Sequence, residues 1–427
     1  MSPDVPVRIA PQADAVAGVY RKIGWRLLPF LLLCYTMSFL DRINIGFAKL
    51  QMQHELGISN TAYGIGAGIF FIGYIFFEVP SNLLLPRFGI RKTISRIMIL
   101  WGLTSACMMF IRGETSFYVM RVLLGIFEAG FVPGVMYYLS FWYGRQYLGR
   151  AIAIFMFAGP IGGALGSPIS GWIIGSLSGH YGLSGWQWLY LLEGSPCILL
   201  GLLVPFVMVE RMEDAKWLSA DEKAIVQSQR SDGGPNAGTF RSALANPKIY
   251  LMSAAYFCIL AGLYIINFWL PTIISENGAK SPMAVGLFAA IPNIAGLIGL
   301  YFGARRSDRV KERRWHSAIP ALLGGVGLAG CAVWHETFWL SLTCIALADA
   351  LMNMAYVVFL AIPAEHFKGR AYAGGFAMIN SIGVMGAFAS PVMVGFVRSS
   401  TGSMNGALLW MSLVMLVASA LLASIRR

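Results

Sequence analysis

The sequence has little charge and no long polar domain. Only 12% of its 427 residues are Asp, Glu, Lys or Arg, and 57% are hydrophobic, whereas about a quarter of a soluble domain is charged. The longest polar stretch covers only residues 210–247, and no basic run is interleaved with exposed aromatics. A soluble core could not bury so much apolar surface. The composition therefore predicts a polytopic membrane protein and argues against a nucleic-acid-binding one.

The cysteines and histidines form no recognisable metal or disulfide pattern. All six cysteines fall in apolar segments without CxxC or Cys/His spacing, and none of the five histidines lies inside a hydrophobic span. No nucleophile–base set of an enzyme is present. We predict no catalytic residues, no metal and no cofactor. Residues 1–23 also lack the short apolar region of a cleaved signal peptide, so the first hydrophobic segment is expected to remain in the protein.

Twelve hydrophobic runs are long enough for the roughly 20 helical residues that cross a bilayer. They predict an all-α integral membrane fold with spans near residues 25–47, 61–84, 93–111, 117–141, 150–174, 187–209, 248–270, 283–304, 316–334, 338–361, 372–397 and 405–425.

Lys and Arg are distributed unequally between alternate loops. Of the 32 basic residues, 26 lie at the two termini or in loops on the same side as the termini, and 4 lie in the opposite loops. The remaining two are inside spans. Basic residues concentrate on the cytoplasmic side of membrane proteins, so this bias predicts that both termini are cytoplasmic.

The chain divides into two similar halves. Residues 210–247 are charged and end in a Gly- and Pro-rich stretch that separates residues 24–209 from 248–427, after an N-terminal segment at 1–23. GRAIA at 149–153 recurs as GRAYA at 369–373, and GALGSP at 163–168 recurs as GAFASP at 386–391. Two pseudo-symmetric six-helix halves around a site near the membrane midplane are typical of secondary transporters.

Four ionisable residues lie within the spans of the first half. Asp41 and Arg42 are embedded in the first span, and Arg121 and Glu128 lie in the fourth. A charge near the bilayer centre costs roughly 2.5–3.5 kcal/mol on insertion scales, so such residues indicate a functional site. Arg42 has the planar fork that binds a carboxylate, although a structural ion pair is the alternative. Adjacent helical residues point about 100° apart, so Asp41 and Arg42 need not be partners.

Arg121 and Glu128 are seven residues apart and share one helix face. Arg121 is either a second ligand for a substrate carboxylate or the partner of a protein carboxylate. In the absence of a histidine within the spans, Asp41 and Glu128 are the candidates for proton coupling, because burial and a change of Arg partner can switch the protonation of a carboxyl.

Other polar residues in the spans have weaker claims. Asp349 and Asn353 are one turn apart in the tenth span, where they either line a cavity or form a structural hydrogen bond. Tyr264 and Asn267 could bind substrate hydroxyls or join helices. Glu78 and Glu193 are expected to make structural contacts.

Several stretches resemble a known family. Twelve spans, a central polar loop and a basic loop after the second span of each half are similar to the major facilitator superfamily. FLDRINIGFA (39–48), FWLPTII (268–274), GWQWLYLLEG (185–194) and AMINSIGVMGAFASP (377–391) resemble its anion:cation symporter branch. Tyr74 and Asn380 match family positions that face the substrate cavity. The family's loop after the second span usually carries an Asp where this chain has Pro86, whereas Asp308 in the sister loop is retained.

The resemblance implies a monomeric, proton-coupled symporter in a bacterial inner membrane. Its partners would be protons, the lipid bilayer and a small organic anion, such as a hydroxy-dicarboxylate like tartrate or a sugar acid. An importer of aromatic carboxylates (phthalate or hydroxyphenylacetate type) and an exporter or antiporter are the alternatives.

Overall fold

The computed structural model describes residues 13–229, 246–310, 312–367 and 369–425, and every regular element in these ranges is a helix. Twelve helical segments of the described chain are long and apolar enough to cross a membrane, which confirms the predicted number. The sequence analysis compared Pro86, which stands where the family usually has Asp, with the retained Asp308. The side chains of both residues lie outside the described part of the chain.

Spans one to six are built from helices of the first half, several of them broken into two pieces. Their bounds are α1 (Ala13–Ile43), α2 (Ile45–Leu56), α3 (Asn60–Phe88), α4 (Ile90–Cys107), η1 (Met108–Phe110), α5 (Glu114–Glu128), α6 (Phe131–Trp142), α7 (Arg145–Met156), α8 (Ala158–Leu177), η2 (His180–Gly182) and α9 (Gly185–Val207).

Two short helices, η3 (Met212–Asp214) and α10 (Ala220–Gln229), belong to the polar connection, of which residues 230–245 lie outside the described chain. Spans seven to twelve follow as α12 (Pro247–Glu276), α13 (Pro282–Val310), α14 (Arg314–Val333), α15 (Phe338–Phe359), α16 (Ile362–His366), α17 (Gly369–Thr401) and α18 (Met404–Ser424).

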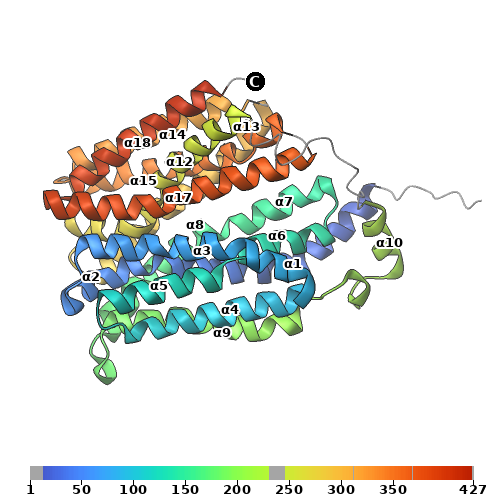
Figure 1. Cartoon of the computed structure of the whole chain (residues 1–427), viewed down its shortest axis with the longest axis horizontal. Coiled ribbons are helices and arrows are strands. Elements are labelled where there is room, and N and C mark those ends of the chain that lie inside the picture. The colour runs from blue at the N-terminus through green and yellow to red at the C-terminus, as the bar shows by residue number, and fades with distance from the viewer. Residues whose placement is uncertain (1–12, 230–245, 311, 368, 426–427) are drawn as a thin grey trace, which may run out of the picture.

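The two halves lie side by side, the first in blue to green and the second in yellow to red (Figure 1). Within the halves, α4 packs on α9, α12 on α17, and α14 on both α15 and α18. Between the halves, α8 packs on α13 and α3 on α17. Glycines make these approaches close: a Cβ on Gly286 would lie 2.4 Å from the carbonyl oxygen of Ser167.

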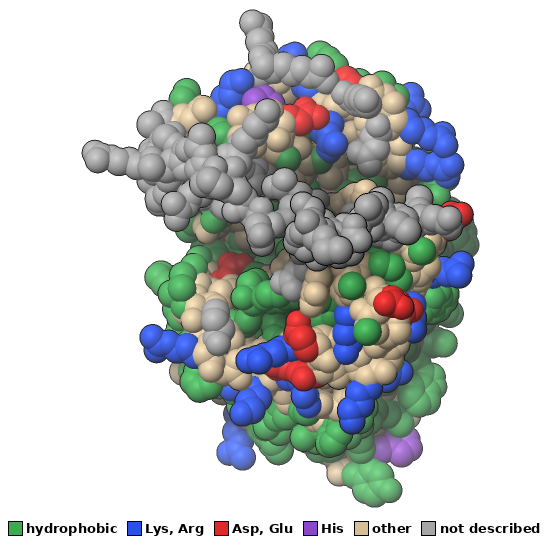
Figure 2. Space-filling view, turned by 90° about the vertical axis from the view of Figure 1, so that its right-hand side faces the viewer, with side chains coloured by type: hydrophobic (Ala, Val, Ile, Leu, Met, Phe, Trp, Pro, Cys, Tyr) green, Lys and Arg blue, Asp and Glu red, His purple; other side chains and the backbone are tan. Residues whose placement is uncertain are grey.

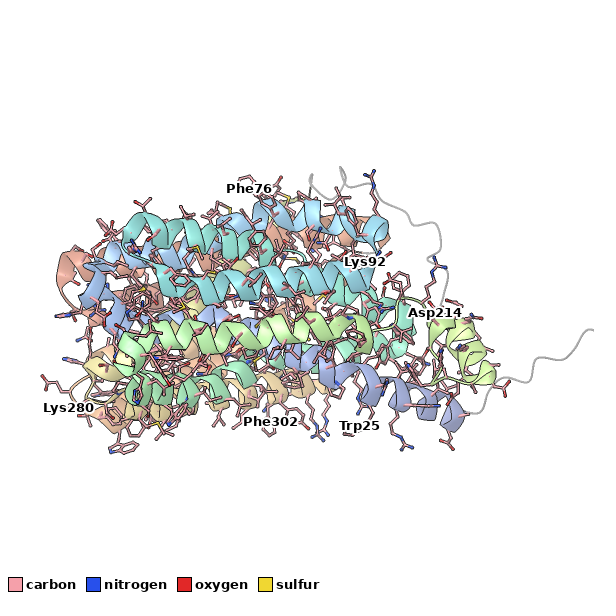
Figure 3. The ribbon with its side chains drawn as sticks, turned by 90° about the horizontal axis from the view of Figure 1, so that it is seen from below. Trp25, Phe76, Lys92, Asp214, Lys280 and Phe302 are labelled. Atoms are coloured by element: carbon pink, nitrogen blue, oxygen red, sulfur yellow. The ribbon has the colours of Figure 1, made fainter. Side chains whose placement is uncertain are left out.

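The sides of the bundle are apolar. Trp25, Phe76 and Phe302 project outward from the helices in Figure 3, and 79%, 71% and 58% of their surfaces are exposed. Large exposed apolar side chains in water would be an aggregation hazard. Their presence along the spans fits a surface that lipid covers.

The first span begins before its predicted start at residue 25 and continues past its predicted end at residue 47. The helix α1 begins at Ala13, well before the predicted start at residue 25, because Val16, Val19 and Tyr20 are buried and give the N-terminal segment an apolar face. Lys22 of this extension forms an ion pair with Glu222 of α10 at 2.8 Å.

Two spans are interrupted beside their ionisable residues. The first span has a turn at Asn44, two residues after Arg42. The fourth span breaks between α5, whose last residue is Glu128, and α6; Gly130 has φ +90° there, and a Cβ on it would lie 2.4 Å from Ser81 Oγ. Interrupted helices in transporters commonly mark binding sites.

The bundle has two distinct ends. We call the end where α1 begins and α18 finishes the termini end, and the other, near Lys280 in Figure 3, the opposite end. Lys and Arg side chains gather around the termini end, which faces the viewer in Figure 2.

Hydrogen bonds join the two halves near the opposite end. Tyr63 donates a hydrogen bond to the carbonyl oxygen of Phe268 at 2.7 Å, and Lys49 donates to Thr272 Oγ1 at 3.1 Å. The Lys49 ammonium also lies 3.8 Å from the ring centroid of Trp269. These bonds join α2 and α3 of the first half to α12 of the second.

Candidate functional site

A cavity of about 580 Å³ lies between the two halves. This volume is in the range of roughly 300–1,000 Å³ that is usual for small-ligand sites. Residues of both halves line it, and seven of them are residues that the sequence put forward: Arg42, Tyr74, Tyr264, Asn267, Asp349, Asn353 and Asn380.

Arg42 is the basic residue of the cavity wall. Its guanidinium forms an ion pair with Glu128 and donates from Nη1 to the hydroxyl oxygen of Tyr264 at 3.2 Å, which joins the two halves. The rings of Phe70 and Tyr74 lie 5.2 and 5.8 Å from its central carbon, within cation–π range. Nε has no hydrogen-bond partner. The group is therefore buried and held, yet it faces the cavity.

Glu128 lies behind Arg42 rather than in the cavity wall. It is the last residue of α5, only 1% exposed, and it accepts a hydrogen bond from Ser38 at 2.7 Å as well as the Arg42 contact. A carboxylate and a guanidinium in this arrangement can separate if another carboxylate reaches Arg42 from the cavity side.

Arg121 is not part of the cavity wall. It is completely buried, and it donates from Nε to the carbonyl oxygen of Gly66 at 3.0 Å and from Nη2 to that of Ala67 at 3.2 Å. Neither Glu128 nor another carboxylate forms an ion pair with it in the described chain. The geometry thus ties Arg121 to the backbone of α3 and separates it from the ligands of the cavity.

Asp41 faces away from Arg42, as the helical angle between neighbours allows. Its carboxyl accepts hydrogen bonds from Trp101 Nε1 at 2.6 Å and Ser105 Oγ at 2.9 Å, both on α4, and lies 3.1 Å from the thiol of Cys197 on α9. It is 2% exposed and has no ion-pair partner within the described residues. Three polar neighbours and no base surround this carboxyl.

Asp349 and Asn353 are joined to each other and also face the cavity. Asn353 Nδ2 donates to Asp349 Oδ1 at 3.1 Å and to its carbonyl oxygen at 2.9 Å. The sequence left open whether this pair lines a cavity or forms a structural hydrogen bond. The two residues do both, because they are hydrogen-bonded on α15 and form part of the cavity wall.

Several wall residues escaped the sequence analysis. Tyr35 lies seven residues before Arg42 on α1, and Tyr256 lies eight before Tyr264 on α12, so helical spacing could have found both. Tyr356 also follows from its spacing, seven residues after Asp349. Asn293 carries no such signal. Glu78 was expected to make structural contacts only, but it lies in the wall.

No cluster of three or more His, Cys, Asp or Glu that could hold a metal ion occurs among the described residues. The cavity wall presents one guanidinium, the carboxyls of Glu78 and Asp349, hydroxyl and amide groups, and aromatic rings.

The family model described as Major Facilitator Superfamily matches residues 31–391. The chain belongs to this superfamily. A metabolite transport protein, NicT, of Pseudomonas putida is 44% identical over 395 residues, which cover 92% of this chain and 90% of that protein. A protein of Agrobacterium vitis named as a tartrate transporter is 41% identical, over 96% of this chain and 91% of its own length.

The fold of this superfamily member matches solved transporter structures. The crystal structure of a bacterial homologue of the human lysosomal transporter Spinster, in an inward-facing and occupied conformation, superposes with a TM-score of 0.77. It covers 94% of this chain and 96% of that chain at 16% identity, so the likeness concerns the fold. The chain is a membrane transporter and not an enzyme.

Proposed function

We propose that this superfamily member is a proton-coupled symporter that imports a small organic carboxylate by alternating access between its halves. The observation that carries the proposal is Arg42, a buried guanidinium in the cavity wall that is held by Glu128 of its own half and by Tyr264 of the other. A substrate carboxylate would take the fork of Arg42 bidentately. Because Tyr264 of the second half accepts a hydrogen bond from Arg42, a movement of Arg42 on binding the substrate would be transmitted to the second half.

In this proposal, proton coupling arises because Glu128 takes up a proton when it loses Arg42 as its ion-pair partner. When a substrate carboxylate binds Arg42, Glu128 loses its counter-ion inside a low-dielectric environment, where an unpaired carboxylate is strongly unfavourable. Uptake of a proton removes this penalty. Release of the substrate would restore the Arg42–Glu128 pair and expel the proton, so that the two ligands travel together.

The membrane potential makes such coupling necessary for import. Each negative charge that enters a cell with a negative interior costs about 2.3 kcal/mol per 100 mV. A dianion would be excluded unless at least two protons accompany it. Glu128 and Asp41 are two buried carboxyls that could carry them.

The orientation of the chain in the membrane is proposed from the distribution of its Lys and Arg residues. The termini end carries most Lys and Arg and would lie in the cytoplasm of a bacterial inner membrane. The contacts of Lys49 and Tyr63 would close the opposite end, so the cavity would be reached from the cytoplasm in this conformation. The chain would act as a monomer of two six-helix domains, 24–209 and 248–427.

The substrate class rests on the cavity wall. Asn267, Asn380 and the tyrosine hydroxyls suit the hydroxyl groups of a hydroxy-dicarboxylate or a sugar acid. The apolar rings of Phe39, Phe71 and Phe376 favour a second candidate, an aromatic carboxylate. Competition between the two classes separates these candidates.

Uptake by the purified protein in proteoliposomes tests the proposed function. A panel of labelled tartrate, sugar acids and aromatic carboxylates is offered with and without an inward proton gradient. We expect one class to accumulate only with the gradient. Transport without a response to the gradient would indicate a uniporter or exchanger, and proton-driven efflux would indicate an antiporter; either result would overturn proton-coupled import.

Tyr264→Phe tests the link between the halves. Loss of the hydroxyl removes one acceptor from a charged donor, which we expect to cost about 1–2 kcal/mol and to raise the KM of uptake about 5- to 30-fold. Tyr250→Phe, at an exposed site on the same helix, is the matched control and should leave KM unchanged. An unaltered KM in Tyr264→Phe would show that the bond contributes nothing to the loaded state.

A further inference from the structure

A second group of buried polar side chains lies inside the first half, outside the cavity wall. It consists of Asn44 at the break of the first span, Ser170 on α8, and Tyr190 and Glu193 on α9. All four are at most 4% exposed. Ser170 Oγ donates to Glu193 Oε1 at 2.7 Å, and Asn44 lies beside the same carboxyl. We call these four residues the α9 polar site.

Much of the hydrogen-bonding capacity of the α9 polar site is unused by the protein. The hydroxyl of Tyr190 has no hydrogen-bond partner, whereas Oε2 of Glu193 and the Asn44 side chain lie beside each other without a hydrogen bond of ordinary geometry to any residue. A buried polar atom without a partner costs about 1–3 kcal/mol. Several such atoms in one place are what an internal water or a mobile proton requires, and simple packing of α8 against α9 would need only the Ser170 bond.

The charge around Glu193 favours its neutral form. No Lys or Arg among the described residues forms an ion pair with it. Of the helices packed against α9, α1 contributes another acid, Asp41; α8 contributes Ser170; and α4 contributes the uncharged Trp101 and Ser105.

The charged groups farther away have other partners. Lys49 of α2 is directed to Trp269, and Glu55 of α2 to Trp186. Arg121 of α5 donates to the carbonyl oxygens of α3 and forms no ion pair with Glu193 in the described chain. A carboxylate in such a place would be strongly disfavoured, whereas a carboxylic acid would not.

The carboxyls of Glu193 and Asp41 are near enough to interact electrostatically. Cys197, one turn after Glu193 on the same face of α9, lies 3.1 Å from Asp41 Oδ2. In the other direction along α9, Trp186 lies two turns nearer the opposite end and donates to the exposed Glu55 at 2.7 Å. Glu193 thus lies between Asp41 and the opposite end of the bundle.

We propose that Glu193 is a third protonatable carboxyl of the transporter and that it passes protons between the opposite end and Asp41. The inference rests on the proton coupling proposed above. In the step, the Glu193 carboxylic acid gives its proton to a water between the two carboxyls, and this water gives one of its own protons to the Asp41 carboxylate. Glu193 is left ionised, and a proton from the aqueous phase at the opposite end then restores the acid. Asn44 and Tyr190 are positioning residues that hold this path polar.

Glu193→Gln tests the proposal in proteoliposomes, because glutamine keeps the acceptor for Ser170 and the volume but cannot release a proton. We expect the maximal rate of gradient-driven uptake to fall at least tenfold, with a changed dependence on pH at the opposite end. Counterflow exchange of substrate, which needs no net proton movement, should stay within about twofold of wild type. Glu193→Asp should recover part of the gradient-driven rate.

Glu114→Gln, the same change of side chain at an exposed position in the first turn of α5, is the matched control and should show wild-type uptake. The proposal is overturned if Glu193→Gln has the wild-type rate and pH profile, or if Glu193→Gln loses uptake and counterflow exchange alike while Glu114→Gln keeps both. These results differ from failure of the proposed function, in which the wild-type protein itself does not respond to the proton gradient.

Discussion

Arg42→Ala is expected to abolish substrate binding in this transporter. The substitution removes the guanidinium of the cavity wall and leaves Glu128 buried without its ion-pair partner. Removal of one member of a buried charged pair typically costs about 2–5 kcal/mol, which corresponds to roughly a 30- to 5,000-fold loss of affinity. Substrate affinity is measured by the binding of labelled carboxylate to the purified protein.

Two further variants separate the role of Arg42 in binding from a role in folding. Arg42→Lys retains the positive charge beside Glu128 but lacks the planar fork, so it should fold and still bind substrate poorly. Arg112→Ala, at an exposed loop position, is the matched control and should bind normally. Wild-type affinity in a folded Arg42→Ala protein would place the substrate elsewhere in the cavity.

The fold was largely predictable because lipid imposes a strong constraint. Every span must satisfy its own backbone hydrogen bonds, so length and hydropathy identify it. The start of α1 was wrong by a wide margin because the segment before residue 25 is polar overall, and only Val16, Val19 and Tyr20 make its buried face. The breaks at Asn44 and Gly130 were not predicted either, since they depend on contacts with other helices.

The sequence identified the buried ionisable residues of the first half but not their partners. Ionisable residues in spans are rare, so Asp41, Arg42, Arg121 and Glu128 stood out. Their partners depend on how α1 and α5 rotate against each other and against α3, α4, α9 and α12, and the sequence contains no direct signal for that.

Two contacts illustrate this limit. The spacing that put Arg121 and Glu128 on one face did not show that α1 would bring Arg42 to Glu128, or that Arg121 would bind the carbonyl groups of α3. Glu193 was expected to make structural contacts, and the sequence does not show that one of its carboxyl oxygens lacks a hydrogen-bond partner or that it forms no ion pair within the described residues.

Glu128→Gln is expected to uncouple transport from the proton gradient. Glutamine can still accept the Ser38 hydrogen bond, but it cannot take up a proton when substrate binds Arg42. Gradient-driven accumulation should therefore disappear, while exchange of internal for external substrate continues, because exchange returns the transporter in its loaded form. The measurement compares the steady-state accumulation ratio with the rate of counterflow in the same proteoliposomes.

Loss of the negative charge of Glu128 should also strengthen the binding of substrate by the Glu128→Gln variant. Without the Glu128 carboxylate, Arg42 no longer has a competing partner, so substrate should bind at least as tightly as in the wild type and with less dependence on pH. Glu114→Gln, exposed in the first turn of the same helix α5, is the matched control and should accumulate substrate normally. If Glu128→Gln accumulated substrate against a gradient as the wild type does, Glu128 would be a structural partner of Arg42, and the coupling proton would have to be carried by the other buried carboxyls, Asp41 and Glu193.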